Sequence, residues 1–221
     1  MEYKRVTLFA GHYGSGKTNI AVNYAFSLKN DGKSVVIADL DIVNPYFRTK
    51  DSERELCEAG IKLISSEFAS SNVDLPALPQ EIYSVVDNRT DYAVMDIGGD
   101  DRGAYALGRY ADSIVKENNY EMLMVINMYR PLTRDVQSTL EVMGEIEQAC
   151  GMRFTAVVNN SNIGEETTAQ DVLDSLGYAN DVASATGLPL KMTTVKADLY
   201  NQLSDRVDNL FPLTLQDKIW R

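Results

Sequence analysis

Near its N-terminus the chain reads Gly11-His12-Tyr13-Gly14-Ser15-Gly16-Lys17-Thr18, which matches the phosphate-binding pattern G-x-x-x-x-G-K-[ST] at every fixed position. The residues before the motif, 5–10, are mostly apolar and predict a buried strand. The residues after it, 19–26, carry apolar side chains at helical spacing. A loop that connects a strand to a helix in this way is the usual setting of a phosphate site. We therefore expect residues 11–18 to bind the phosphates of a nucleotide.

Each fixed residue of the motif has a physical role. Gly14 and Gly16 allow backbone conformations in which successive N–H groups point to one anion, and the following helix adds the positive end of its dipole. Lys17 is expected to reach the β- and γ-phosphates, and Thr18 to ligate Mg²⁺. A glycine-rich turn without a ligand would explain the glycines but not the Lys-Thr pair. The expected nucleotide-binding residues of this segment are Gly11, His12, Gly14, Ser15, Gly16, Lys17, Thr18 and Asn19.

Composition is that of an ordinary globular protein. The 221 residues are 44% hydrophobic and 24% charged, which predicts one domain over residues 1–221. The net charge of −11 disfavours direct binding to nucleic acid or to an anionic membrane. No apolar run is long enough to cross a bilayer and no signal peptide fits before the first strand, so we expect a cytoplasmic protein. Cys57 and Cys150 form no CxxC pair and His12 is the single histidine, which disfavours zinc sites and His-based triads.

Strand and helix patterns alternate along the chain. Besides residues 5–10, strands are predicted at 34–39, 61–64, 92–97, 121–127, 154–159 and, last, 190–194. Helices are predicted at 19–26, 52–59, 80–88, 104–118, 133–149 with Thr133 as its cap, 167–186 and 197–210, with a final turn or helix at 213–220. Residues 65–79 predict a long loop. The alternation predicts the α/β class, with a mostly parallel sheet flanked by helices on both faces, as in P-loop NTPases.

Two of the predicted strands end in carboxylates. Asp39 and Asp41 end the sequence Val-Val-Ile-Ala-Asp-Leu-Asp, and Asp96 is followed by Ile-Gly-Gly. Because ligands of such sheets bind at the carboxyl ends of the strands, these side chains are expected beside the phosphate-binding loop. An aspartate at a strand end can hold Mg²⁺ directly or through water. A helix cap or a plain loop carboxylate is the alternative for each residue taken alone.

The order of these three segments resembles that of the MinD/ParA class of P-loop ATPases (CobQ/CobB/MinD/ParA, SIMIBI). The resemblance implies Mg²⁺ and ATP as cofactors and Lys17 and Asp41 as catalytic residues. In this comparison Asp41 matches the switch I aspartate that positions or activates the attacking water, and Asp96 matches the Walker B aspartate. Thr18, Asp41 and Asp96 are the implied metal-binding residues. Asn159 resembles the base-contacting residue of the class, and Thr194 and Val195 lie where a late loop packs on the adenine.

One position departs from the pattern of that class. Its members usually carry a second lysine directly after the first glycine of the loop, and that lysine reaches the phosphates of a partner subunit. This chain has His12 there, which puts the usual nucleotide-dependent homodimer in question. His12 either performs a weaker, pH-dependent version of that role, contacts phosphate within its own chain, or has no role. Loops without the lysine also resemble those of dethiobiotin synthetase and related small-substrate enzymes.

Other features concern partners. The segment Asn44-Pro45-Tyr46-Phe47-Arg48 places aromatic residues after Asp41, which suits a protein partner, a substrate pocket or a cover for the sheet edge. Arg130 and Arg134 flank the loop after the predicted strand at 121–127, where each either binds an anion or is a solvated cap. The chain end Lys218-Ile219-Trp220-Arg221 is too short for a direct membrane anchor.

The sequence favours ATP over GTP, because the strand predicted at 154–159 is followed by Asn160-Ser161-Asn162 without the aspartate that reads guanine. Two functions fit. The first is an ATPase switch with slow hydrolysis whose state is read by a protein partner. The second is an enzyme that uses ATP to phosphorylate or activate a small acid, as a dethiobiotin synthetase-like or cobyrinic amidase-like ligase or kinase would. We expect the first, and a GTPase with unusual base recognition is a weaker third.

Overall fold

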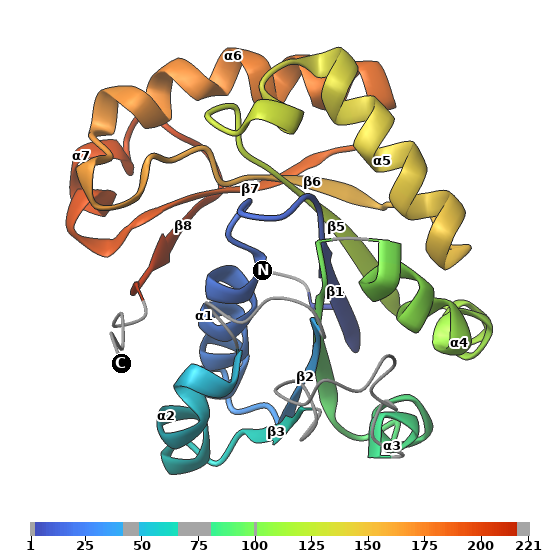
Figure 1. The fold of residues 1–221 in the computed structure, drawn as a ribbon. Coiled ribbons are helices and arrows are strands. Elements are labelled where there is room, and N and C mark those ends of the chain that lie inside the picture. Colours follow the sequence, from blue (N-terminus) through green and yellow to red (C-terminus); the bar gives the residue numbers. More distant parts are fainter. Residues whose placement is uncertain (1–2, 42–48, 66–80, 100, 216–221) are drawn as a thin grey trace.

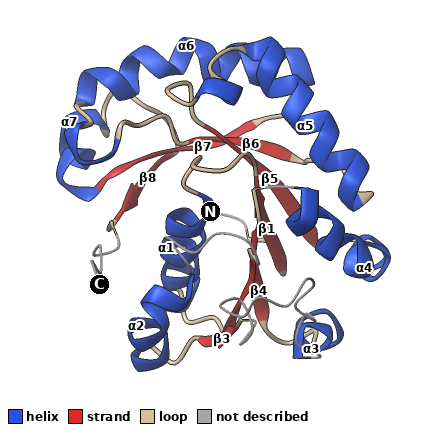
Figure 2. Ribbon diagram, viewed as in Figure 1, coloured by secondary structure: helices blue, strands red, loops and turns tan. Residues whose placement is uncertain are grey.

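A computed structural model describes residues 3–41, 49–65, 81–99 and 101–215. Within these ranges one parallel sheet of eight strands has the order β3-β2-β4-β1-β5-β6-β7-β8 (Figure 2). The strands are β1 Val6–Ala10, β2 Val35–Leu40, β3 Lys62–Ile64, β4 Tyr92–Ile97, β5 Tyr120–Ile126, β6 Ala156–Asn159, β7 Leu190–Lys196 and β8 Leu210–Leu213. Every neighbouring pair is parallel. The expected class is therefore confirmed, with a sheet that is wholly rather than mostly parallel.

Helices cover both faces of the sheet (Figure 1). They are α1 Lys17–Asn30, α2 Glu53–Glu58, α3 Glu81–Asp87, α4 Asp101–Glu117, α5 Val136–Cys150, α6 Ala169–Thr186 and α7 Tyr200–Leu203. The side chains of β1 alternate between the two faces: Leu8 packs in the cluster with α3, α4 and α5, and Phe9 packs in the cluster with α1. Each face of the sheet thus has its own apolar core, as a parallel sheet requires.

The strand order places the N-terminal loop at the middle of the sheet. β1 lies between β4 and β5, so β2, β3 and β4 lie on one side of it and the later strands β5 to β8 lie on the other. The direction of winding therefore changes beside β1, and ligands of open α/β sheets bind in the crevice at such a point. The segment between β1 and α1, which contains the phosphate-binding motif, lies at this crevice.

Several predicted boundaries and elements are wrong. The cap of α5 is Asp135, whose side chain accepts a hydrogen bond from the N–H of Ser138, and Thr133 instead ends a short 3₁₀ turn at Pro131–Thr133. The strand predicted at 190–194 extends to Lys196 and is not the last. The helix predicted at 197–210 is reduced to a 3₁₀ turn and the single turn of α7, and residues 210–213 form β8. Of the element predicted at 213–220, residues 216–220 lie outside the described residues.

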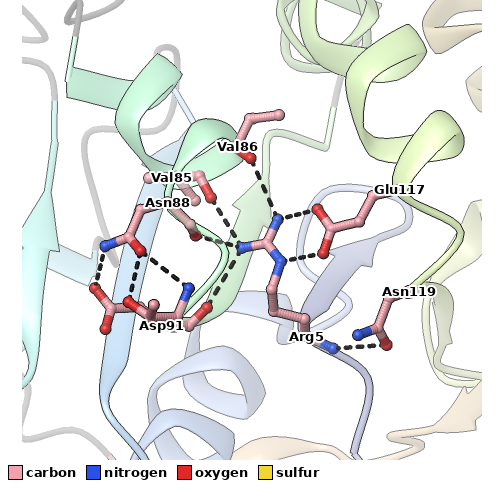
Figure 3. A network of polar contacts seen from close by, with 8 residues as sticks. Arg5, Val85, Val86, Asn88, Asp91, Glu117 and Asn119 are labelled. Atoms are coloured by element: carbon pink, nitrogen blue, oxygen red, sulfur yellow. Dashed lines mark hydrogen bonds and ion pairs between the residues drawn. The ribbon is translucent and has the colours of Figure 1, made fainter.

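A buried ion pair fixes the opposite rim of the sheet. Arg5, directly before β1, pairs with Glu117 at the end of α4, and both side chains are buried. The guanidinium also donates to backbone carbonyls at the end of α3 and in the following turn, among them those of Val85 at 3.1 Å and Asn88 at 3.0 Å (Figure 3). One side chain therefore ties α3, α4 and β1 together at the end of the sheet away from the phosphate-binding motif.

Candidate functional site

The loop between β1 and α1 has a shape that depends on its glycines. A Cβ atom on Gly11 would lie 2.4 Å from the carbonyl oxygen of Val125, and one on Gly16 would lie 2.2 Å from Nδ2 of Asn160. Gly16 has a φ of +90° and directly precedes the first residue of α1. The close approach of neighbouring chain segments therefore explains these glycines independently of any ligand. The result is a helix N-terminus that opens onto the loop.

Polar contacts inside the loop converge on one carbonyl group. The carbonyl oxygen of His12 accepts hydrogen bonds from Nζ of Lys17 at 3.3 Å and from the N–H of Ser15 at 3.2 Å. The hydroxyl of Ser15 is buried and has no hydrogen-bond partner among the described residues. The His12 ring is partly exposed, and its Nδ1 lies 3.0 Å from the carbonyl oxygen of Tyr13. The backbone of His12 thus positions Lys17, and its imidazole contacts the backbone of its own loop.

Asp96, at the end of β4, is the buried carboxylate of the site. Its Oδ2 accepts a hydrogen bond from the hydroxyl of Thr49 at 3.2 Å, and its Oδ1 is buried without a partner among the described residues. Burial raises the pKa of Asp96 from 3.8 to about 6, a shift that Lys17 and a hydrogen bond from Thr18 oppose and that the charge of Asp41 reinforces. A cation beside Oδ1 would relieve the cost of burying this charge.

Asp39 and Asp41 have different roles in the structure. Oδ1 of Asp39 accepts a hydrogen bond from the N–H of Asp41 at 2.9 Å and thereby shapes the end of β2. Asp41 lies against the backbone after β4, where a Cβ on Gly98 would be 3.4 Å from its Oδ1. Residues 42–48, including the aromatic segment expected to contact a partner or substrate, lie outside the described residues.

The chain after Asp96 packs directly on the phosphate-binding loop. A Cβ on Gly99 would lie 2.6 Å from the backbone nitrogen of Tyr13 and 2.9 Å from Nζ of Lys17. Only glycine allows the backbone to come this close. A change in the position of Gly99 would therefore directly affect Lys17 and the phosphate-binding loop.

At the other end of the site the structure separates two neighbouring asparagines. Asn159, predicted to contact a base, directs its amide to Oγ of Ser175 at 2.9 Å and is fully buried. Asn160 instead donates to the backbone carbonyl of Ser15 and accepts a hydrogen bond from Oγ1 of Thr194. Asn160 thus connects the phosphate-binding loop to the ends of β6 and β7, and the sequence reasoning missed it.

Asn160 could have been found from the alternation of side chains along a strand. Val157 packs in the core on the α4–α5 face, and Val158 packs in the core on the α1 face. With a period of two, residue 160 faces α1 and residue 159 faces away from it. Thr49, the other missed contact, follows a segment with no regular pattern, and no sequence signal points to it.

These residues surround a cavity of about 530 Å³, a size suited to a nucleotide or similar ligand. Of the predicted site residues, those that line it are Gly14, Gly16, Lys17, Thr18, Asn19, Asp41, Thr194 and Val195. Its other walls are residues 160–165 and a group of apolar side chains, Val172, Leu213 and Leu215. The cavity therefore has a polar end at the phosphate-binding loop and an apolar end between β7, β8 and α6.

The oxygen donors at the polar end of the cavity, together with Asp96 beside it, could hold Mg²⁺. Among the described residues no group of three or more His, Cys, Asp or Glu side chains could hold a metal ion. Asp41, Asp96 and the Thr18 hydroxyl provide two carboxylates and one neutral oxygen. Magnesium commonly binds one or two carboxylates and takes its remaining ligands from phosphate and water. The unpaired Oδ1 of Asp96 is consistent with such a site.

Residues 6–188 match the model of the CobQ/CobB/MinD/ParA nucleotide binding domain. The chain belongs to this family. The family assignment agrees with the resemblance seen in the sequence, and nucleotide binding is the property that the family's description names. No curated protein sequence matches the chain.

Solved structures with the same fold include signal recognition particle receptors. FtsY from Elizabethkingia anophelis, in complex with GDP, has 17% identity and a TM-score of 0.55, with 88% of this chain and 58% of that chain covered. FtsY from Thermotoga maritima has 20% identity and a TM-score of 0.58, with 86% of this chain and 61% of that chain covered. Chloroplast FtsY from Physcomitrella patens has 18% identity and a TM-score of 0.59, with 87% of this chain and 59% of that chain covered.

The likeness to these receptors concerns the fold. The chain spans about three fifths of their length, as the coverage of 58% to 61% shows. None of the helices in the described part of the chain is both long enough and apolar enough to span a membrane.

Proposed function

We propose that this member of the family is a Mg·ATP-binding ATPase that acts as a nucleotide-dependent switch with slow hydrolysis. The observation that carries the proposal is the buried carboxylate of Asp96, whose Oδ1 has no partner among the described residues and which lies beside Lys17 and Thr18. A buried, unpaired carboxylate next to a phosphate-binding loop is suited to hold the cation of a metal–nucleotide complex.

The proposed roles follow from where the side chains lie. Lys17 binds the β- and γ-phosphates and stabilises the charge of the transferred phosphoryl group. Thr18 and Asp96 would hold Mg²⁺, and Asp41, at the cavity wall, would orient the attacking water and help to hold the metal. Mg²⁺, when bound, neutralises phosphate charge and fixes the geometry of the phosphates.

The walls of the cavity support ATP rather than GTP. The residues after β6 are Asn160, Ser161, Asn162 and Ile163, with no aspartate to accept hydrogen bonds from guanine. The nearby carboxylate of Glu165 is paired with Lys196 at 2.9 Å. Thr194 and Val195 are proposed to pack on the adenine. Asn160 takes the position beside the base that the sequence suggested for Asn159.

The switch itself is proposed to lie in the segments that follow Asp41 and Asp96. Thr49, where the first of these segments ends, donates a hydrogen bond to Asp96. Gly99, in the second, abuts Tyr13 and Lys17. Thr49 and Gly99 therefore each lie next to a residue of the proposed Mg·ATP site, and a protein partner could read a change at either. A nucleotide-dependent homodimer is one form of that partner.

Hydrolysis by the purified protein tests the proposal, measured with Mg·ATP and with Mg·GTP at several protein concentrations. We expect slow ATP turnover that is faster than GTP turnover. Lys17→Ala and Asp41→Ala should each abolish the ATP turnover. Lys17→Ala should also weaken ATP binding sharply, whereas Asp41→Ala should bind ATP like the unaltered protein. A specific rate that rises with protein concentration would support a dimer despite His12.

Other outcomes would contradict parts of the proposal. Tight ATP binding without turnover would favour the small-molecule enzyme, whose substrate would then be missing from the assay. Normal turnover by Asp41→Ala would remove Asp41 from the mechanism. No binding of ATP or GTP by the unaltered protein would overturn the proposal as a whole.

A further inference from the structure

An arginine from a different part of the chain lies over the phosphate-binding loop. Arg130 is in the segment between β5 and α5, yet a Cβ on Gly14 would be 3.6 Å from its Nε and 3.8 Å from its Cζ. Arg130 lines the same cavity as Lys17 and Thr18. Its guanidinium thus lies against the loop backbone and faces the space where phosphates are expected.

The segment that carries Arg130 is held by a network of hydrogen bonds. Oδ1 of Asn127 accepts from the N–H of Tyr129 at 3.0 Å, and Nδ2 of Asn127 donates to the carbonyl of Asn162 at 3.1 Å. The N–H of Met128 donates to Oγ of Ser161 at 3.0 Å. The N–H of Arg130 itself donates to the carbonyl of Asn127 at 3.0 Å. The backbone at Arg130 is therefore fixed to both the end of β5 and the loop after β6.

The charges around the cavity set Arg130 apart. The described basic residues that line it are Lys17, Arg130 and Lys196, and Lys196 pairs with Glu165 and Asp198. Within the described ranges, Arg130 has no ion pair with a carboxylate. The whole chain carries a net charge of −11, so a polyanionic nucleotide must be attracted by local positive charge. A guanidinium without a carboxylate partner is well suited to bind phosphate through two parallel hydrogen bonds.

We propose that Arg130 is a phosphate-binding residue, supplied by the chain to its own nucleotide site, which contacts the phosphate chain from the side of Gly14. This inference rests on the proposed nucleotide binding at residues 11–18 and adds a residue outside the family's loop motif. Arg130 provides from within the chain a second positive charge at a loop that carries His12 where a second lysine is usual.

The chain offers a matched control four residues away. Arg134 is exposed, as Arg130 is, but its Nε lies 3.4 Å from the carboxylate of Asp135. Arg134 does not line the cavity. Replacing Arg134 therefore changes the net charge by the same amount without removing the proposed contact.

The test compares Arg130→Gln, Arg130→Lys and Arg134→Gln by calorimetric titration with Mg·ATP and Mg·ADP over a series of salt concentrations. We expect Arg130→Gln to weaken binding about tenfold and Arg130→Lys to weaken it less, because lysine keeps the charge but not the paired hydrogen bonds. Arg130→Gln should also show a shallower dependence of affinity on salt. Arg134→Gln should bind like the unaltered protein, and all three variants should keep its melting temperature.

The outcomes separate this inference from the proposed function. If the unaltered protein binds nucleotide and Arg130→Gln binds equally well with the same salt dependence, the role of Arg130 is overturned and the proposed function stands. Equal losses in Arg130→Gln and Arg134→Gln would also overturn it, because general charge would then explain the effect. Failure of the unaltered protein to bind ATP, ADP and GTP would overturn both.

Discussion

At the scale of single residues, Asp96 has opposite effects on stability and on the proposed function. Burial raises its pKa from 3.8 to about 6, so the folded protein without ligand binds this proton more tightly than the unfolded chain does. Between about pH 4 and pH 6 the unfolded chain loses the proton first. The contribution of Asp96 to stability therefore declines as pH rises through this window, and above it the cost of burying the charge is complete.

Asp96→Asn should remove this cost. At neutral pH and without Mg²⁺ or nucleotide, we expect the variant to be more stable than the unaltered protein by about 1–3 kcal/mol, because each pKa unit corresponds to about 1.4 kcal/mol. The difference should shrink as the pH is lowered toward about 4, where Asp96 is protonated in both states. Thermal unfolding over this pH range measures it.

The same variant should bind Mg·ATP poorly and lack turnover, because the proposed metal-binding carboxylate is gone. Asp39→Asn is the comparison, since Asp39 accepts a backbone hydrogen bond and has no proposed contact with the metal. A stability difference that does not change with pH would show that the titration of Asp96 does not cause it.

The sequence predicted the residues of this site that belong to a local motif, and it missed those that depend on packing. Gly11–Thr18 could be predicted directly because all of the phosphate contacts proposed for this motif come from one short loop. Asn160 acts through a carbonyl in that loop, 145 positions away in the chain. To choose Asn160 over Asn159, one needs the direction in which each side chain of β6 points. The alternation of side chains along the strand gives that direction, and composition does not.

At the scale of elements, apolar periodicity predicted the strands from β1 to β7 and the long helices between them. This periodicity gave a wrong prediction after β7. Residues 197–210 have apolar side chains at helix-like spacing because Leu203 and Val207 pack against Val172 and Val195. β8 contains Pro212, which argues against a strand unless the strand lies at an edge. β8 is the edge strand of this sheet, a position that only the strand order reveals.

Arg5 provides a test of how elements are held together away from the site. Arg5→Met should lower the free energy of unfolding by about 3–5 kcal/mol, because it leaves the buried carboxylate of Glu117 unpaired and removes donors from carbonyls at the end of α3 (Figure 3). Denaturant titration of the nucleotide-free protein measures this loss.

Removing both charges should be less damaging than removing one. The double variant Arg5→Met, Glu117→Met should recover part of the stability, since no unpaired charge then remains buried. Nucleotide affinity should stay unchanged wherever the variants are folded, because this network lies at the opposite rim of the sheet. Equal stability of Arg5→Met and the unaltered protein would show that the network does not stabilise the fold.

At the scale of the whole molecule, the candidate site joins both halves of the sheet. Asp41 and Asp96 come from β2 and β4, on one side of β1, whereas Arg130, Asn160 and Thr194 follow or belong to strands on the other side. The convergence of strand ends on one rim was expected from the sequence, but the order of the strands was not, because β4 inserts between β2 and β1. A ligand in the cavity would contact segments from both halves at once.

Hydrogen exchange can test this coupling. Saturating Mg·ATP should slow amide exchange in two separate segments, residues 11–18 and residues 160–167, because one ligand would hold both walls of the cavity. Exchange in β3 and in the turn around Asn88 should not change, since neither borders the cavity. At about one hundred times its dissociation constant the ligand should also add about 2.7 kcal/mol to the free energy of unfolding.

Lys17→Ala supplies the control, because it should show neither the slower exchange nor the added stability under the same conditions. Asp41→Ala should keep both, since Thr18 and Asp96 would still hold the metal and the main proposed role of Asp41 is in turnover. Slower exchange confined to residues 11–18 would mean that the nucleotide does not reach the loop after β6, and Asn160 would then hold the phosphate-binding loop without facing the base. Slower exchange throughout the sheet would instead indicate general stabilisation and would contradict a contact limited to the two walls.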